Sequence, residues 1–296
     1  MATHSSQTPL NTNHGFIVFD LETDGLIHKS GYGETMIPQI LQIGFAPLEK
    51  LAHKMNVTSY YAQPMNPTEF LDKLSKTHML QKYYIGYNYG YYSLKTGEKV
   101  KANPLRICID NLIAWKKYYY KDQPVFLIAH HGIKFDKVVF EYNLNKLNLQ
   151  DYFESKMNLV GWIDSLQLIR ELPDILRELG YGLPREMTES EKWVIIKKNT
   201  PFSLSNLILA LAKRYAELTA VQTKLEWPIF DLSLQRSKEE EEWQHYFTKE
   251  SMIHSYRILI SKLNPHNASD DVMALVCILH HLNLYPKIKK MVLEML

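Results

Sequence analysis

Three acidic side chains follow one short apolar run near the start of the chain. In GFIVFDLETDGL, residues 15–26, Asp20, Glu22 and Asp24 come directly after FIVF. Because side chains alternate along a strand, Asp20 and Glu22 should share one face while Leu21 points into the packing on the other. Two converging carboxylates need a compensating cation, and Mg²⁺ or Mn²⁺ suits hard oxygen ligands. Taken alone, the segment is equally compatible with exposed acids at a strand end.

Two further acids occupy comparable places. Asp136 in AHHGIKFDKVVFE comes just after an apolar run typical of a buried strand, and Asp271 in HNASDDVMALVCILHHL falls in the first turn of an expected apolar helix. Open α/β sheets carry their sites at the carboxyl ends of strands, so these acids can meet Asp20 and Glu22 there. Four such carboxylates predict a centre of two divalent ions about 3.5–4 Å apart, one activating a water and one stabilising a leaving 3′ oxygen.

A histidine lies five residues before the last of these acids. A neutral imidazole beside the metals could take the proton from the attacking water, and the ordinary pKa of histidine suits a base near neutral pH. His266 is therefore the candidate general base. In the polar stretch NPHNAS, a capping or surface histidine is the alternative.

The elements that must position these residues follow from hydrophobic periodicity. Buried or partly buried strands are expected at 16–19, 37–46, 57–62 and 124–131, and a strand followed by a helix at 161–172. Helices are expected from about residue 67, and at 105–119, 135–144, 202–216 and 268–282. Asp164 should cap the helix within 161–172 or lie as an acid at the edge of the site, rather than serve as a fifth ligand. This order predicts an α/β fold with a mixed central sheet flanked by helices.

The tyrosine-rich segment 83–92, YYIGYNYGYY, contains turn-forming residues between aromatic ones. This pattern favours an aromatic hairpin, and stacking of the tyrosines on nucleic-acid bases is the functional alternative.

Composition sets broader limits. The chain has 296 residues, 46% of them hydrophobic and 22% charged, with a net charge of +2, so a surface that coats polyanions is not indicated. Cys108 and Cys277 lie in apolar runs, as buried reduced thiols of an intracellular protein do. No apolar stretch has the roughly 18 residues of a membrane helix. We expect a soluble, cytoplasmic protein that makes no membrane contact.

The order of the three motifs resembles the DEDDh, or DnaQ-like, 3′ to 5′ exonuclease family. The motifs are FDLETDG, AHHGIKFD and HNASDD, and IPQILQIGFAPLE, WIDSLQLIREL and FSLSNLILAL resemble the segments between them. The resemblance covers most of residues 15–285. It implies an RNase H-like fold, two divalent cations, Mg²⁺ with Mn²⁺ as a substitute, and stepwise release of 5′-mononucleotides from the 3′ ends of single-stranded DNA or RNA.

The family's functional residues carry over position by position. The resemblance implies that Asp20, Glu22, Asp136 and Asp271 bind the metals and that His266 is the general base. It also implies substrate contacts by Leu21, Thr23, Gly25, Leu26, His131 and Phe135. His131 departs from the pattern, because the family usually has Asn at that position.

The chain is expected to form a flexible N-terminus, 1–14, and one exonuclease domain, 15–296. Insertions are expected near 83–103, 182–199 and 227–250, and they could form a lid, a protein-partner or oligomer surface, or a substrate-selecting element. The alternative function is an inactive or weakly active exonuclease-fold protein that binds nucleic acid or serves as a scaffold in a complex.

Overall fold

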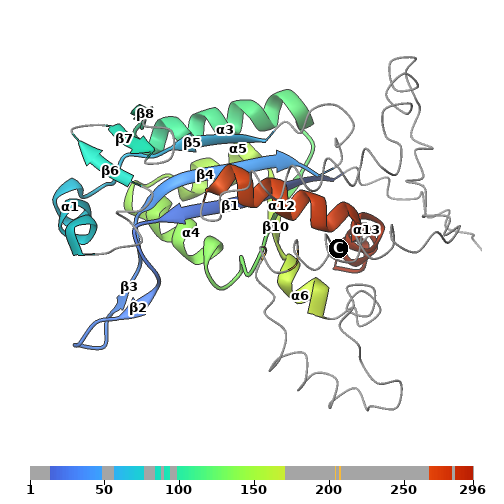
Figure 1. Ribbon diagram of the computed structural model, residues 1–296. Coiled ribbons are helices and arrows are strands. Elements are labelled where there is room, and N and C mark those ends of the chain that lie inside the picture. The colour runs from blue at the N-terminus through green and yellow to red at the C-terminus, as the bar shows by residue number, and fades with distance from the viewer. Residues whose placement is uncertain are drawn as a thin grey trace, which may run out of the picture.

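The computed structural model describes residues 14–48, 57–76, 84–87, 90–93, 99–170, 204, 207, 267–281 and 284–295 (Figure 1). Its centre is a five-stranded sheet. The strand order is β10 (Leu159–Asp164), β9 (Val125–Ala129), β1 (Gly15–Thr23), β4 (Ile40–Pro47) and β5 (Thr58–Tyr61). β1 runs parallel to β9, and β9 runs parallel to β10, whereas β4 is antiparallel to both of its neighbours. The sheet is therefore mixed.

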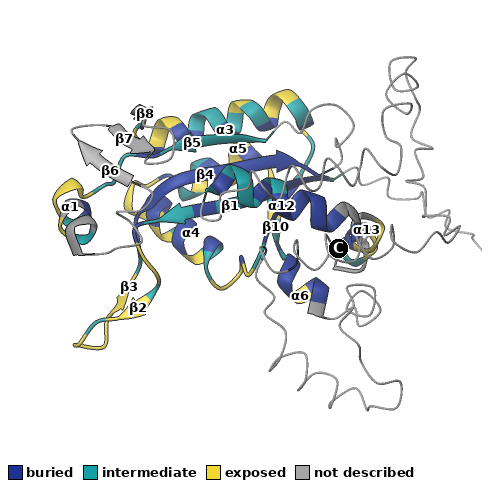
Figure 2. Cartoon of the chain, in the orientation of Figure 1, coloured by how far each residue is buried: buried dark blue, intermediate teal, exposed yellow. Residues whose placement is uncertain are grey.

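Helices cover both faces of this sheet, so its central strands are almost continuously apolar. One face packs against α6 (Ser165–Arg170), α12 (Ala268–His281) and α13 (Leu284–Met295). The other face packs against α3 (Leu105–Tyr120), α4 (Asp136–Lys146) and α5 (Gln150–Met157). Figure 2 shows β4 buried along its whole length between these layers. The predicted α/β fold with a mixed central sheet is confirmed.

Alternation along β1 decides which layer each side chain meets. Phe16 and Val18 belong to the core beneath α12, whereas Ile17, Phe19 and Leu21 belong to the core on the opposite face. Because the side-chain period of a strand is two, Asp20 and Glu22 continue the α12 face at the carboxyl end of the strand.

Three smaller elements lie outside the main sheet. β2 (His28–Lys29) and β3 (Thr35–Met36) form an exposed hairpin that follows β1, and α1 (Pro67–Lys76) follows β5 (Figures 1 and 2). β6 (Tyr84–Tyr87), β7 (Gly90–Ser93) and β8 (Lys99–Lys101) form a separate antiparallel sheet. The hairpin predicted at 83–92 is confirmed, and β8 adds a strand that was not expected.

Several sequence predictions fall wholly or partly outside the described residues. These are the N-terminus, most of the helix expected at 202–216, the insertions at 182–199 and 227–250, and His266. Cys108 and Cys277 are both buried and unpaired, as expected. Within the described ranges, no helix combines the length and the apolar character needed to cross a membrane.

Candidate metal centre

Carboxylates that are far apart in the sequence lie close together between β1 and α12. Asp20 and Glu22 project from β1, and Asp271 comes from the first turn of α12. One oxygen from each of the three lies within 4.8 Å of the other two. The neighbouring Asp270 is not part of this group. The structure thus brings together three of the four acids that the sequence singles out.

Gln42 of β4 fixes the start of α12 against the sheet. It is fully buried and lies opposite Glu22 in the antiparallel ladder. Its Oε1 accepts a hydrogen bond from Ala268 N at 3.1 Å, and its Nε2 lies 3.4 Å from Asn267 Oδ1. Asn267 Oδ1 also accepts from Ser269 N at 3.1 Å, so it caps the helix. These contacts set where Asp271 lies relative to Glu22.

Gly44 allows the same helix to approach closely. It lies opposite Asp20 in the ladder, and a Cβ atom at this position would lie 2.3 Å from Ala268 O. Since Cβ atoms do not approach backbone oxygens so closely, a larger residue would push α12 away from β4. The glycine therefore contributes to the short distance between Asp271 and Asp20.

Asp136, the fourth acid, lies outside this group, in the layer on the opposite face of the sheet. It is the first residue of α4, it is 3% exposed, and its Oδ1 accepts a hydrogen bond from Leu21 N at 3.1 Å. The turn before it is held by Asp164, whose Oδ1 accepts from His131 N at 3.1 Å and from Leu166 N at 3.0 Å. Asp164 thus caps α6, as predicted, and also ties the turn after β9 to β10.

Burial and the charges of neighbouring acids disfavour the ionised forms of Asp20 and Glu22. Burial, together with the charges of Asp136, Glu22 and Asp271, raises the pKa of Asp20 well above its usual range. Burial and the charges of Asp271 and Asp136 raise the pKa of Glu22 to about 9. Burial raises the pKa of Asp136 to about 7, although the N–H group of Leu21 opposes the shift. Without a cation, the centre holds protons that isolated carboxyl groups would release at neutral pH.

A divalent cation fits this donor set. Asp20 Oδ2 is buried and has no hydrogen-bond partner among the described residues, which is a costly arrangement for a carboxylate oxygen. A cation would give that oxygen a partner and would neutralise the clustered charge. Asp136 is the first residue of α4, and Asp271 lies in the first turn of α12. Because the N-terminus of a helix carries partial positive charge, both positions favour an ionised acid.

The residues expected to contact a substrate differ in how accessible they are. The Leu21 side chain is 5% exposed and packs in the core beneath the sheet, so only its main chain remains for such a contact. Thr23 is half-buried and donates its hydroxyl hydrogen to Gly25 O at 2.6 Å. Gly25 is exposed with open space above it, and Leu26 is 74% exposed. The segment 23–26 thus offers an accessible surface beside the acids.

The other expected contacts lie around the turn before α4. His131 is exposed and has a left-handed backbone with φ of 61°, held by its bond to Asp164. Phe135 is partly buried against the core, next to Asp136. His266 is outside the described residues, although Asn267, which follows it, is the cap of α12.

The sequence patterns gave no role to three residues that shape the centre or the segment beside it. Gln42 and Gly44 interrupt the apolar run of IPQILQIGFA, and a polar side chain inside a fully buried strand is a signal that could have identified Gln42. Asp24 was noted as the third acid of its segment but was given no role. Its partners, Gln39 and Lys73, are distant in sequence, so no local pattern connects them.

The chain is similar to solved structures but matches no family model. Neither the scan against protein-family models nor the search of curated proteins finds a match. Among solved structures, the zinc-ion-bound form of an E. coli ExoI–ssDNA complex is similar over 95% of this chain and 43% of its own chain, at 12% sequence identity and a TM-score of 0.46. This chain thus spans less than half the length of that protein.

Proposed function

We propose that this chain is a metal-dependent 3′ to 5′ exonuclease of the DEDDh type, which releases 5′-mononucleotides from the 3′ ends of single-stranded nucleic acid. The observation that carries the proposal is the convergence of Asp20, Glu22 and Asp271 within 4.8 Å. These acids belong to the motifs in which the sequence resembles that family.

Each acid has a proposed role that agrees with its surroundings. Asp20, Glu22 and Asp271 would bind divalent ions directly, and the unpartnered Asp20 Oδ2 supports this role. Asp136 would complete the set from the start of α4, with its orientation fixed by Leu21 N. When bound, two divalent ions would supply Lewis-acid activation of water and stabilisation of the leaving 3′ oxygen.

The remaining roles belong to side chains around the acids. His266 would accept the proton of the attacking water, and it directly precedes Asn267, which Gln42 holds against β4. Thr23, Gly25 and Leu26 would contact the terminal nucleotide, because they form an accessible segment directly after Glu22. A preference for single strands would follow if only an unpaired end can reach the half-buried acids.

The test is the degradation of 5′-labelled DNA and RNA oligomers, single-stranded and double-stranded, with Mg²⁺, Mn²⁺ or EDTA. The proposal predicts a ladder of products that shorten one nucleotide at a time from the 3′ end and that disappear with EDTA. Comparison of the DNA and RNA substrates identifies the preferred sugar. Oligomers that are bound but not cut with either metal would instead favour a nucleic-acid-binding module.

A further inference from the structure

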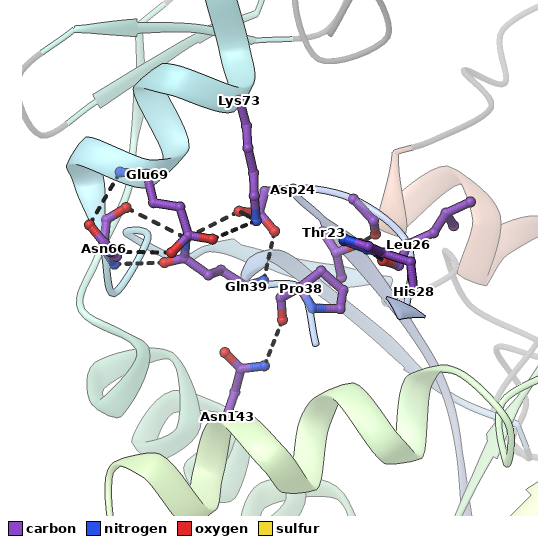
Figure 3. Close-up of polar contacts among 11 residues, drawn as sticks. Thr23, Asp24, Leu26, His28, Pro38, Gln39, Asn66, Glu69, Lys73 and Asn143 are labelled. Carbon is purple, nitrogen blue, oxygen red and sulfur yellow. Dashed lines mark hydrogen bonds and ion pairs between the residues drawn. The ribbon is translucent and has the colours of Figure 1, made fainter. Parts of the chain in front are cut away.

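Asp24 is a buried acid that the proposed metal centre does not use. Its side chain is fully buried, and Oδ1 accepts a hydrogen bond from Gln39 N at 2.7 Å (Figure 3). Oδ2 accepts from Gln39 Nε2 at 3.1 Å, and Asp24 N donates to Gln39 O at 3.1 Å. Asp24 thus binds both the main chain and the side chain of one residue.

These bonds form where the regular pairing of β1 with β4 breaks down. The register shifts between Glu22 and Thr23, so that the partner changes from Gln42 to Ile40 and Leu41 is passed over. One residue later, the carboxylate of Asp24 accepts from Gln39 N in place of a main-chain carbonyl. The Asp24 side chain therefore joins the two segments immediately after Glu22, alongside the main-chain bond from Asp24 N to Gln39 O.

A lysine from α1 neutralises the Asp24 carboxylate. Lys73 Nζ lies 2.9 Å from Asp24 Oδ2 and 2.8 Å from Glu69 Oε1. Gln39 also reaches α1, because its Oε1 accepts from Asn66 N at 2.6 Å. Asn66 Oδ1 in turn accepts from Glu69 N at 3.2 Å at the start of the helix. We call Asp24, Gln39 and Lys73 the Asp24 clamp.

The clamp fixes a segment whose other residues face outward. Asp24 is buried, whereas Gly25 and Leu26 on its carboxyl side are exposed. Figure 3 shows Thr23, Leu26 and His28 beside the clamp; Thr23 bonds Gly25 O, and His28 Nδ1 lies 2.9 Å from Leu26 O. On the other side of the hairpin base, Asn143 of α4 donates to Pro38 O at 3.0 Å.

We propose that Asp24 and Lys73 are positioning residues that hold Thr23, Gly25 and Leu26 in place to bind the 3′-terminal nucleotide. This inference rests on the proposed function. Asp24 is fully buried and Lys73 is partly exposed, and the desolvation of a buried carboxylate offsets much of what an ion pair gains, so stability alone does not explain this pair. What it supplies is a single orientation of the Thr23–Leu26 segment, because the carboxylate is held from two elements at once.

The test compares Lys73→Met with wild type. The substitution keeps the aliphatic stem of Lys73 but leaves Asp24 without its cation. We expect the KM for a 5′-labelled single-stranded oligomer to rise about tenfold while kcat changes less than about twofold, because the segment binds substrate but carries no reacting group. The Kd of a fluorescein-labelled oligomer with Ca²⁺, from fluorescence anisotropy, should rise by a similar factor. Lys73→Arg should restore both values to near wild type.

Two further variants complete the experiment. The double variant Asp24→Asn/Lys73→Met removes both charges, so it avoids an unpaired buried carboxylate if Lys73→Met does not fold, and it should also raise KM and Kd. Arg106→Met is the matched control, because Arg106 forms an i,i+4 ion pair on α3, to Asp110 at 3.1 Å, as Lys73 does with Glu69 on α1. Its KM and Kd should equal those of wild type.

The outcomes separate this inference from the proposed function. Unchanged KM and Kd in folded Lys73→Met and in the folded double variant, with only a lower melting temperature, would show that the clamp is merely structural and would overturn the inference. A fall in kcat at constant KM would overturn it as well. Failure of wild type to cut any oligomer would instead refute the proposed function, and the ratio of Kd values would still decide the role of the clamp.

Discussion

Gly44 and Ala268 are in such close contact that a single methyl group would not fit between them. A Cβ atom on Gly44 would lie 2.3 Å from the carbonyl oxygen of Ala268, three residues before Asp271. The glycine also lies opposite Asp20 in the ladder of β1 and β4. The geometry of the acidic cluster thus depends on glycine at position 44 as well as on the charged side chains.

Gly44→Ala tests this relationship. We expect it to destabilise the chain by about 1–3 kcal/mol, because α12 must shift to admit the methyl group. Displacement of Asp271 should also reduce the rise in melting temperature that Mg²⁺ produces. Gly161→Ala on β10 is the control, because its Cβ would lie at an ordinary 3.8 Å from Phe126. Equal stability of the two variants in urea unfolding would contradict a close contact at Gly44.

Gln42→Leu removes the polar anchor of α12. The loss leaves Ala268 N without its side-chain acceptor, and such an unpaired buried group costs about 1–3 kcal/mol. We expect weaker Mg²⁺ binding in addition to lower stability, measured by calorimetry and by urea unfolding. Gln63→Leu, which removes a single hydrogen bond to Ala102 O, should leave Mg²⁺ binding intact. The anchoring role is refuted if both variants bind Mg²⁺ as wild type does.

Asp271→Asn tests the metal centre, and Asp270→Asn, at the adjacent acid in the sequence, is its control. Wild type should gain about 2.7 kcal/mol of stability at a metal concentration one hundred times the Kd. Asp271→Asn should lose most of that gain, because one of the three clustered carboxylates becomes a neutral amide. Asp270→Asn should keep the gain, since Asp270 is outside the cluster. The measurement is the melting temperature with and without Mg²⁺, and an equal loss in both variants would argue against the assignment.

The stability of the metal-free chain should fall as pH rises, whereas the stabilisation by Mg²⁺ should grow. The pKa of Glu22 is raised from 4.5 to about 9 and that of Asp136 from 3.8 to about 7. A folded state that holds protons more tightly than the unfolded chain loses stability as pH rises through this range. Their contribution to the metal-free chain is therefore full below about pH 4 and lost by about pH 9.

Divalent ions compete with these protons, so the gain in melting temperature from Mg²⁺ should grow with pH. Thermal unfolding between about pH 5 and pH 8, in EDTA and in Mg²⁺, measures both effects. Asp20→Asn should flatten the metal-free dependence, because it removes one of the interacting charges. A Mg²⁺ effect of the same size at both ends of the range would be inconsistent with protonated acids in the metal-free cluster.

The parts of the centre that sequence reasoning could predict depend on local patterns. Alternation along β1 predicted that Asp20 and Glu22 share a face and that Leu21 lies in the core. The apolar pattern after Asn267 predicted a helix with Asp271 in its first turn, close to those acids. The two-residue strands β2 and β3 are too short to show any periodicity. α5 has mixed polarity and no strong apolar face, so the hydrophobic pattern did not identify it.

The remaining features depend on partners that are far apart in sequence. Asp24 is neutralised by Lys73, 49 residues away, and Gln42 bonds Ala268, 226 residues away. In each case the sequence shows a polar residue in an unusual place but not what it contacts. Only the position of α1 next to Asp24 and the packing of α12 against the sheet identify those contacts.

The proposed metal-dependent exonuclease activity is tested most directly by measuring the degradation of a 5′-labelled single-stranded oligomer with Mn²⁺. Wild type, Asp271→Asn and Asp270→Asn are compared in the same experiment. We expect a ladder shortening from the 3′ end with wild type and Asp270→Asn, and intact oligomer with Asp271→Asn. Cutting by Asp271→Asn at the wild-type rate, or an oligomer left intact by wild type, would contradict it.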